Sequence, residues 1–410
     1  MTNSTLHVVF AAPFFLDATL AFLRGTAQLP NIVLSVISQD PAEKIPPGIR
    51  SRIAAHWQVR DGLDSHQLLD GVRRLSRELG SADRLIGPLE QLQVPLAEVR
   101  EALNLPGLSV AASHNFRDKS LMKQVLTAAG VPCARHTLVT SPEALAGFAR
   151  EVGFPLIIKP TAGAGGTGTL RIDNPEQLAL HLSRWPVNPQ NPIMVEEYVR
   201  GEEHSFDSVV IDSRPVWFSI SRYMPSPLEV MENDWIQWCV VLPREVSGPD
   251  FSPIREAGFR GVQALGLTTG LSHLEWFRLP SGGIAVSEVG ARPPGAQFTS
   301  LLSYAHDIDF YEAWPRLLVH NQFEPPQRRY ACGAAYIRGQ GKGRVLRIHG
   351  IERAQAKYGG LVVEAKLPKQ GQRPSSSYEG DGYVIVRHPD TEVVEEALWG
   401  LVRTLRVELG

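Results

Sequence analysis

Two acidic strands joined by a short turn restrict the fold of this chain more than any other feature of its sequence. Residues 273–279 and 284–290 have the composition of β-strands, and the Pro-Ser-Gly-Gly sequence between them predicts a four-residue hairpin loop. If the last residue of the first strand pairs with the first residue of the second, Glu275 lies directly opposite Glu288. The same face would then carry four apolar side chains: Phe277, Leu279, Ile284 and Val286.

Two carboxylates on an apolar face need a physical explanation. Directly opposed Cβ atoms lie about 4.5–5.5 Å apart, so the like charges of Glu275 and Glu288 repel. Either one carboxyl is protonated, because burial and its neighbour raise its pKa, or a hard cation such as Mg²⁺ lies between them. The alternative is a solvated hairpin with unrelated acids, or a slipped register, and neither requires a cation. If the register holds, the acid pair therefore predicts either a carboxyl with a raised pKa or a metal site.

A glycine-rich loop between two short strands, at 156–159 and 169–172, is the second informative motif. It formally matches GxGxxG, but the dinucleotide-binding form of that pattern opens a helix, and a Walker A loop ends in Gly-Lys-Ser/Thr. A glycine loop inside a β-hairpin can fold over a nucleotide and offer backbone N–H groups to phosphates, with Lys159 adding a cation. The alternative is a surface hairpin that binds nothing. The candidate loop residues are Gly163, Gly165, Gly166, Thr167 and Gly168.

The composition argues against several classes of protein. The 410 residues include 41 Lys+Arg and 43 Asp+Glu, with a hydrophobic fraction of 43%, so neither nucleic-acid binding nor wholesale disorder is expected. The three cysteines lie roughly a hundred residues apart, which predicts no disulfide framework and a reducing, cytoplasmic location. The apolar run 8–16 is shorter than the ~20 residues that cross a bilayer, so we expect a buried strand and no membrane partner.

Strands and helices alternate over residues 7–110, which predicts a parallel α/β layer. Because Ala-Ala-Pro and not a glycine motif follows the first strand, a dinucleotide-binding Rossmann domain is not expected. The elements expected in this part are strands at 7–12, 32–38 and 84–87 and helices at 16–23 and 65–79. A helix is expected at 117–129 with four apolar residues on one side: Leu121, Val125, Leu126 and Ala129. Further strands are expected at 193–198, 205–211, 215–221, 236–242, 272–279 and 284–290, and a last helix from Thr391.

The segment 195–203, Val-Glu-Glu-Tyr-Val-Arg-Gly-Glu-Glu, is a strand that ends in acids and a tight turn. Alone it indicates an ordinary edge strand. Its position is more informative, because a helix-borne Lys119, the strand lysine with its glycine loop, this segment, the glutamate hairpin and Arg292 follow one another within residues 113–300. That order resembles the ATP-grasp superfamily. The resemblance implies an α/β fold with three domains: a pre-ATP-grasp domain at 1–113, an ATP-grasp domain at 114–325 with a lid at about 133–198, and a C-terminal α/β domain at 326–410.

The resemblance also implies roles in ATP binding. Lys119 and Lys159 match the two lysines that contact the nucleotide phosphates, and the loop 163–168 matches the loop that closes over them. Glu196 matches the acid near the adenine amino group, and Glu203, seven residues later, matches the acid that binds the ribose hydroxyls. The other implied ATP-binding residues of this segment are Glu197, Tyr198 and Val199.

The implied metal ligands are Glu275 and Glu288, in agreement with the hairpin register. Arg292 matches the arginine that reaches the reacting acyl phosphate, and Lys159 is expected to assist it in catalysis. Many members carry Asn two residues after the second glutamate as a third ligand, whereas this chain has Gly290. The resemblance therefore leaves open whether one or two ions, Mg²⁺ or Mn²⁺, are bound.

The implied activity is that of an ATP-dependent carboxylate–amine ligase, similar to the amino-acid and dipeptide ligases, with small-molecule substrates and a homodimeric assembly. A biotin-carboxylase or purine-biosynthesis type of enzyme shares the same nucleotide residues, and a non-catalytic ATP-binding module is the alternative from another class. The candidate substrate contacts are Arg222, His273 and Trp276, although packing alone would also explain the histidine and the tryptophan.

Overall fold

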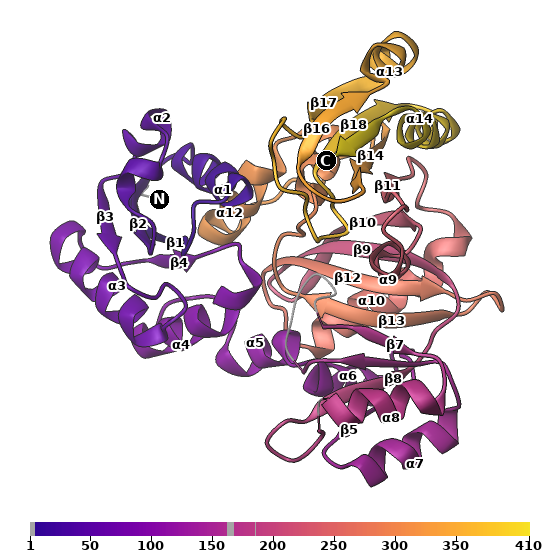
Figure 1. The fold of residues 1–410 in the computed structure, drawn as a ribbon. Helices are drawn as coiled ribbons and strands as arrows, with labels where there is room; N and C mark the ends of the chain where they lie inside the picture. The colour runs from indigo at the N-terminus through magenta and orange to yellow at the C-terminus, as the bar shows by residue number, and fades with distance from the viewer. Residues whose placement is uncertain (1–4, 162–167, 185) are drawn as a thin grey trace.

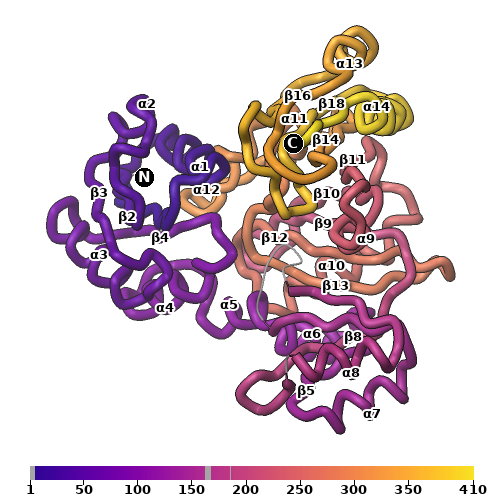
Figure 2. Tube along the Cα trace, in the orientation of Figure 1, coloured from indigo at the N-terminus to yellow at the C-terminus, as the bar shows by residue number. Residues whose placement is uncertain are grey.

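The structure is a computed structural model that describes residues 5–161, 168–184 and 186–410. Figure 1 shows an N-terminal α/β unit beside a large central sheet, a small sheet with two helices at the other end, and a C-terminal unit that continues the central sheet. The trace in Figure 2 follows the same path from the first strand to the last. Among the described residues, no helix combines the length and apolar character needed to cross a bilayer.

The N-terminal unit is built on a parallel sheet, as the alternation of strands and helices predicts. The strand order is β3 (Ala55–Gln58), β2 (Ile32–Ser38), β1 (Leu6–Ala11) and β4 (Arg84–Ile86). Its helices are α1 (Asp17–Ala27), α2 (Pro47–Arg50), α3 (Ser65–Leu79) and α4 (Gln93–Leu103), with 3₁₀ turns η1 (Ala42–Lys44) and η2 (Glu90–Leu92). Asp64 caps α3 by accepting from the N–H groups of His66 and Gln67. The apolar run at the N-terminus is the buried central strand β1, as expected.

The lid region is a second sheet of antiparallel strands, in the order β5 (His136–Val139), β8 (Ile193–Glu197), β6 (Leu156–Lys159) and β7 (Leu170–Ile172). Helices α7 (Pro142–Val152) and α8 (Pro175–Arg184) belong to this region. Strands β6 and β7 pair as an antiparallel hairpin, which confirms that the glycine loop joins two strands. Gly163, Gly165, Gly166 and Thr167 themselves lie outside the described residues, whereas Gly168 has a positive φ of 76°.

The central sheet has eight strands and extends across the predicted boundary at residue 326. Its order is β13 (Ile284–Gly290), β12 (Gly270–Arg278), β9 (Glu202–Ile211), β10 (Arg214–Met224), β11 (Cys239–Leu242), β14 (Ala331–Ile337), β18 (Gly382–His388) and β17 (Val362–Lys366). One face packs against α5 (Val110–Arg117), α6 (Lys119–Ala128) and α10 (Ser252–Ala264). The other packs against α11 (Phe298–His306) and α12 (Phe310–His320), and α12 also contacts α1 and β4 of the N-terminal unit. The domain limits therefore stay predictions, because one sheet joins the last two predicted domains.

The C-terminal unit packs α14 (Thr391–Thr404) on strands β14 and β18 through Val394, Leu398 and Leu401, and the helix begins where the sequence predicts it. A small sheet, in the order β15 (Gly339–Gln340), β19 (Arg406–Leu409) and β16 (Val345–His349), completes this unit. The remaining short elements are α9 (Pro227–Glu232), α13 (Ile351–Tyr358), η3 (Pro249–Phe251) and η4 (Gly359–Leu361).

The helix predicted at 117–129 is wrong in one respect that bears on the site. Asp118 interrupts it and caps α6, accepting from the N–H groups of Ser120 and Leu121. The most buried residues of α6 include Lys119 and Lys123 beside apolar ones, not the predicted side with Leu121 and Val125. Hydrophobic periodicity misses this face because two of its members are lysines that carboxylates draw inward.

Candidate nucleotide and metal site

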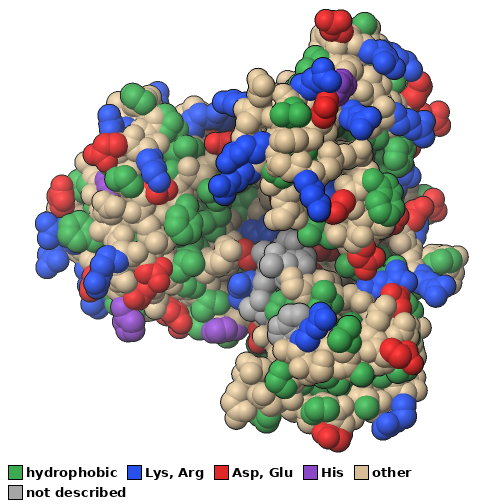
Figure 3. Space-filling view, in the orientation of Figure 1, with side chains coloured by type: hydrophobic (Ala, Val, Ile, Leu, Met, Phe, Trp, Pro, Cys, Tyr) green, Lys and Arg blue, Asp and Glu red, His purple; other side chains and the backbone are tan. Residues whose placement is uncertain are grey.

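The predicted opposition of the two glutamates is confirmed. Glu275 on β12 and Glu288 on β13 are direct partners in the antiparallel ladder. Since alternate residues of a strand point to the same face, Glu275 shares its face with His273, and Glu288 shares it with Gly290. Glu288 lies on β13, the edge strand of the central sheet, and Glu275 lies on the adjacent strand β12. Figure 3 shows a recess between the N-terminal unit and the rest of the molecule.

The register at the turn differs from the prediction. Leu279 donates its N–H to the carbonyl of Gly283 at 2.9 Å, so Ile284 pairs with Arg278 and not with Leu279. A β-bulge at Ser287 then adds one residue and brings the two glutamates back into opposition. As a consequence Ile284 and Val286 lie on the opposite face, in the core with Trp276, and the predicted apolar surround of the acid pair is wrong in this respect.

The two glutamates have different neighbours. Glu288 forms an ion pair with Lys119 at the start of α6. Glu275 accepts a hydrogen bond from the hydroxyl of Tyr223 at 3.3 Å, and one of its oxygens lies 3.8 Å from Nε2 of His273. Burial alone would raise the pKa of Glu275, but His273, Lys119 and Lys159 outweigh it and lower that pKa. Glu275 is therefore available to a cation as a carboxylate, and Glu288 is engaged by Lys119.

His273 is held by a buried aspartate. Its Nδ1 lies 2.7 Å from Oδ1 of Asp207, which is fully buried on the neighbouring strand β9. Burial opposes the charged imidazole, yet Asp207 and Glu275 prevail and raise the pKa of His273 to about 9. The side chain is thus an imidazolium at neutral pH, fixed between one structural and one candidate metal-binding carboxylate. Sequence reasoning named the histidine but not its aspartate.

A second buried cluster is centred on Glu196 of β8. Its Oε2 accepts a hydrogen bond from Lys159 Nζ at 3.0 Å, and its Oε1 lies 3.4 Å from Nζ of Lys123. Lys123, which the sequence analysis missed, is 1% exposed and also donates to the carbonyl of Val286 at 3.0 Å. Burial would raise the pKa of Glu196, but the two lysines lower it to about 2.

Hydrogen-bonding capacity in this cluster fits a nucleotide. Oε1 of Glu196 is buried and accepts no hydrogen bond from the described residues, so it is free to accept from an amino group such as that of adenine. Lys159 has a raised pKa, because Glu196, Glu288 and Glu275 outweigh its burial, and so it keeps the charge that a phosphate requires. Both observations are consistent with the roles that the resemblance implies, and those roles stay predictions.

The side chains of the two residues that follow Glu196 contact other parts of the lid region. The carboxylate of Glu197 accepts from Nε of Arg135 at 2.7 Å and from its backbone N–H at 2.9 Å. Tyr198 donates its N–H to the carbonyl of Pro155 at 3.2 Å, and its ring lies under the guanidinium of Arg171. Neither side chain of this pair joins the Glu196 cluster, and Val199 is half-buried.

Glu203 is paired across the sheet with Phe277, so it lies on the face of Glu275. Burial, followed by the charges of Glu275 and Glu288, raises its pKa to about 8 although Lys159 opposes the shift. The side chain is therefore a neutral carboxyl group at pH 7, which can both donate and accept a hydrogen bond. A ribose hydroxyl pair offers both kinds of partner.

Arg292 follows strand β13 and lies against the N-terminal unit. Its Nε donates to Oε2 of Glu90 at 2.6 Å, and Nη1 donates to the carbonyl of Pro293 at 2.9 Å. Burial is outweighed by Glu90, Glu288 and Glu275, which raise the pKa of the guanidinium. Arg292 thus lies near three acids, Glu90, Glu275 and Glu288. Glu90 is a site residue that no sequence motif indicates.

An aromatic group from the C-terminal unit reaches the same region. Tyr378 contacts Trp238 edge to face at 4.7 Å, and Trp238 in turn contacts Tyr223, the donor to Glu275. Burial and then the charge of Glu275 raise the pKa of the Tyr378 phenol, so the hydroxyl stays protonated. Tyr378, from the segment between β17 and β18, therefore contributes to the wall of the site.

Two predicted substrate contacts lie away from this face. Arg222 pairs with His204 on the other side of the sheet and forms an ion pair with Glu395 of α14 at 2.5 Å. Trp276 is fully buried and stacks on His204 at 4.6 Å. The structure therefore brings together Lys119, Lys159, Glu196, Glu203, His273, Glu275, Glu288 and Arg292, but neither Arg222 nor Trp276.

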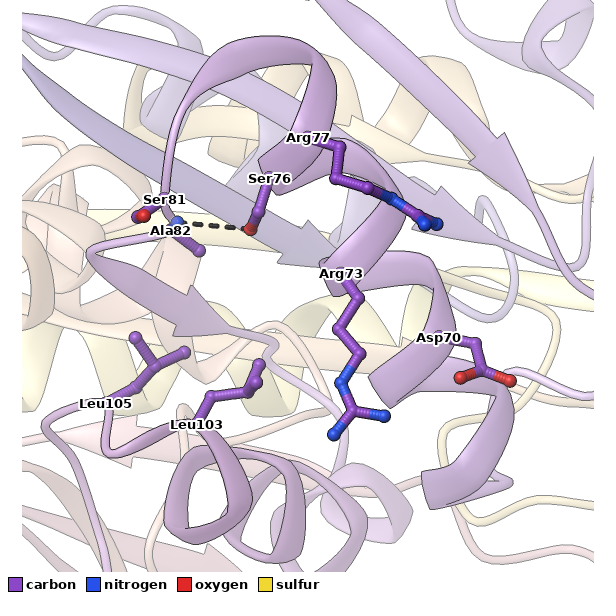
Figure 4. Close-up of a pocket in the computed structure, with 8 residues that line it drawn as sticks. All are labelled: Asp70, Arg73, Ser76, Arg77, Ser81, Ala82, Leu103 and Leu105. Carbon is purple, nitrogen blue, oxygen red and sulfur yellow. Dashed lines mark hydrogen bonds between the residues drawn. The ribbon is translucent and has the colours of Figure 1, made fainter.

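A separate groove of about 570 Å³ on the N-terminal unit contains none of these residues. Figure 4 shows that its two arginines, Arg73 and Arg77, point in different directions and that its one drawn hydrogen bond joins Ser76 to the backbone of Ala82. Because no polar groups converge there, the groove is unrelated to the candidate site.

Comparisons with known proteins show similarity to ATP-binding enzymes. Residues 118–216 match the family described as the carbamoyl-phosphate synthase L chain, ATP binding domain. An uncharacterized protein of Sinorhizobium fredii is 26% identical over 73% of this chain and 60% of its own length, and the L-arginine-specific L-amino acid ligase of Bacillus subtilis is 24% identical over 66% of each chain. The aligned region thus spans less than two thirds of these two curated relatives.

Among solved structures, the L-amino acid ligase from Bacillus licheniformis has a TM-score of 0.79 at 19% identity and covers 99% of both chains. N5-carboxyaminoimidazole ribonucleotide synthetase from Thermotoga maritima has a TM-score of 0.73 at 18% identity over 99% of this chain. At these identities the likeness concerns the fold, and two enzymes of different activity share it. The matched ATP-binding region at 118–216 and the shared fold thus make this chain similar to the ATP-grasp ligases.

Proposed function

We propose that this chain is an ATP-dependent carboxylate–amine ligase that forms an amide or peptide bond, with an amino acid as at least one substrate. The observation that carries the proposal is the pair Glu275 and Glu288, directly opposed and bordered by Lys119, His273 and Arg292. The similarity to an L-amino acid ligase across 66% of the chain supports the choice of substrate class.

The donor set fits a divalent cation that also binds ATP. Glu275 and Glu288 supply hard oxygen ligands, and among the described residues no set of three His, Cys, Asp or Glu side chains is arranged to hold a metal alone. Two carboxylates plus phosphate oxygens are a usual environment for Mg²⁺. When bound, Mg²⁺ or Mn²⁺ would neutralise charge on the phosphoryl oxygens. Lys119 would then exchange Glu288 for a phosphate.

The chain's own residues account for the two chemical steps. A substrate carboxylate oxygen attacks the γ-phosphorus, the bond to the bridging oxygen breaks, and ADP leaves an acyl phosphate behind. Lys119, Lys159 and Arg292 hold the phosphoryl oxygens and stabilise the charge that develops on them. The amine nitrogen of the second substrate then attacks the acyl carbon, phosphate departs, and the nitrogen loses a proton. No protein nucleophile is needed in either step.

The finer features remain part of this proposal. ATP contacts are assigned to Lys119, Lys159, the glycine loop, Glu196, Tyr198, Val199 and Glu203, with Glu197 acting through its backbone because its carboxylate is engaged by Arg135. The three domain limits, a homodimeric assembly and a cytoplasmic location are proposed as well. The three cysteines are free thiols, which supports a reducing compartment.

The test is release of phosphate from ATP and Mg²⁺ across single amino acids and pairs of amino acids. We expect one pair to stimulate release, and Glu275→Gln and Glu288→Gln to abolish it. Glu245→Gln is the matched control, since that carboxylate is 76% exposed beside Arg244. Silence across the panel with ATP binding intact by calorimetry would contradict an amino-acid ligase and favour a binding module or another carboxylate.

A further inference from the structure

Glu90 and Arg292 form a close contact between two units of the chain. They are 202 residues apart in sequence, and Oε2 of Glu90 lies 2.6 Å from Nε of Arg292. Both side chains are shielded, with exposed fractions of 11% and 19%. A charge-assisted bond of this length in a shielded position orients both groups more firmly than a surface ion pair does.

The carboxylate of Glu90 occupies the space that a side chain at position 290 would use. A Cβ added to Gly290 would lie 3.2 Å from Oε2 of Glu90 and 3.8 Å from both Cγ and Nε of Arg292. Residue 290 is two positions from Glu288 in the same strand, so that Cβ would point to the face of the acid pair. Glycine here gives access to Glu90, which accounts physically for the missing asparagine.

The segment that carries Glu90 is fixed to the N-terminal sheet. Gln93 donates its Nε2 hydrogens to the carbonyls of Gly87 at 3.2 Å and Leu89 at 2.9 Å. Gly87 itself has no room for a side chain, because a Cβ would lie 2.8 Å from the carbonyl oxygen of Ala11 on β1. Glu90 is therefore presented by a rigid turn and not by a free loop.

The bonds that Arg292 makes leave a specific set of donors available. A guanidinium has five N–H groups. Glu90 takes the Nε hydrogen and the carbonyl of Pro293 takes one Nη1 hydrogen. Among the contacts of the described residues, the other three N–H groups stay unused. One of them is on Nη1 and two are on Nη2, so both terminal nitrogens keep a hydrogen with which to donate to an oxyanion.

We propose that Glu90 is the positioning residue of Arg292, supplied by the N-terminal unit, and that Gly290 is free of a side chain in order to admit it. The inference rests on the proposed function for the role of Arg292. Glu90 holds the side edge of the guanidinium so that its end faces the reacting acyl phosphate. The N-terminal unit thereby contributes directly to the geometry of phosphoryl transfer.

The test compares Glu90→Ala, Glu90→Gln and Gly290→Ala with the double variant Glu90→Ala/Gly290→Ala. We expect each single alanine variant to lower kcat by about 10- to 100-fold, because a misplaced catalytic group of this kind costs that much. KM for ATP and calorimetric ATP affinity should stay unchanged. The double variant should be little worse than Glu90→Ala, since the added methyl group has nothing left to displace. Glu90→Gln, which keeps an acceptor oxygen, should recover part of kcat.

Asp17→Asn is the matched control, because Asp17 pairs with Lys366 at 2.5 Å and also joins the N-terminal unit to a distant strand without touching Arg292. Additive losses in the double variant would overturn the proposal. So would an unchanged or raised kcat in Glu90→Ala, the raised value meaning that Glu90 competes with substrate.

A second readout does not depend on turnover. In the ¹⁵N spectrum of the arginine side chains, the Nε–H of Arg292, assigned with Arg292→Lys, should be protected from exchange with water in the unaltered protein. Loss of that protection in Glu90→Ala and in Gly290→Ala supports the proposal, and its retention in both overturns it. If no substrate pair is turned over, the proposed function fails while this signal still decides the role of Glu90.

Discussion

Two glutamates seven residues apart, the buried Glu196 and the half-buried Glu203, have pKa values shifted in opposite directions. The pKa of Glu196 is lowered to about 2, whereas that of Glu203 is raised to about 8. Burial favours the neutral form of both, so burial does not explain the difference. Glu196 lies between two lysines, Lys123 and Lys159, whereas the nearest charges to Glu203 include Glu275.

The difference indicates that the Glu196 cluster and the Glu203 face have different roles in one site. The charged cluster around Glu196 is complete without a ligand except for one free acceptor oxygen, so it fits a rigid support for the base and the phosphates. The face with Glu203, Glu275 and Glu288 carries an excess of acid groups, and a bound cation would relieve it. At one end of the site the charges of the protein compensate one another, and at the other end acid groups are in excess. Such a site is suited to binding a nucleotide together with its metal ion.

The largest effect on stability is expected when the charged cluster around Glu196 loses one of its two lysines. Lys123→Met keeps the volume but leaves Glu196 with one cation and removes the bond to the carbonyl of Val286. Because uncompensated buried charges are costly, we expect the free energy of unfolding to fall by about 3–5 kcal/mol in urea titrations. Lys342→Met, at an exposed turn, is the control and should change little. A loss no larger than the control's would show that the cluster does not stabilise the fold.

Glu196 also predicts a pH dependence on the acid side. Its folded pKa lies below that of an unfolded glutamate, so its contribution to stability is present above about pH 4.5 and is lost as the pH falls toward 2. Glu196→Gln should flatten that part of the curve of melting temperature against pH. If the melting temperature of this variant falls at low pH as steeply as that of the unaltered protein, other carboxylates dominate the loss of stability in acid.

Glu203 predicts the opposite dependence. Its folded pKa is raised, so its contribution is present below the unfolded value of about 4.5 and is lost as the pH rises through about 8. We expect the melting temperature to decline over this range and Glu203→Gln, a permanent neutral mimic, to decline less. His273, with a pKa of about 9, adds to the same limb, so the comparison requires His273→Gln in parallel.

The sequence was sufficient for the acid pair but not for its surroundings. The hairpin pattern placed Glu275 opposite Glu288 although the assumed pairing at the turn was off by one, because the bulge at Ser287 compensated the error. A bulge leaves no periodic signal in a strand of seven residues. The same slip reversed the predicted orientation of Ile284 and Val286.

Contacts between segments that are distant in sequence could not be predicted either. The α/β order and the hairpin around the glycine loop follow from local patterns of strands, turns and caps, and the three-domain fold follows from the resemblance that the order of the motifs carries. Lys123 and Glu90 do not, since each acquires its role from a partner that lies far along the chain and that only tertiary packing brings near. Lys123 even contradicts the local pattern, because a lysine on the buried side of a helix lowers the apolar periodicity that predicts that side.

A smaller effect is expected for the group that supports Glu275. His273→Gln keeps a hydrogen-bonding side chain beside Asp207 but removes the positive charge near the acid pair. Neighbours of metal ligands typically change affinity by tenfold or more, and we expect Mn²⁺ to bind about tenfold more weakly or more tightly by electron paramagnetic resonance. Weaker binding means that His273 orients Glu275, and tighter binding means that its charge competes with the cation. His349→Gln, at a surface ion pair, should leave Mn²⁺ affinity unaltered.

The smallest effect is expected at Glu197, the residue next to the Glu196 that Lys123 neutralises. Glu197 follows Glu196 in the same strand, but its carboxylate points to the other side and pairs with Arg135, whose side chain is 53% exposed. Exposed ion pairs contribute about 0–1 kcal/mol, because water already solvates both charges and holding long side chains costs entropy. Glu197→Gln should therefore change the free energy of unfolding by less than about 1 kcal/mol and leave ATP affinity intact. A loss as large as that of Lys123→Met would mean that the outer ion pair fixes the hinge, and the contrast between the two ends of the site would then need another basis than burial and counter-charge.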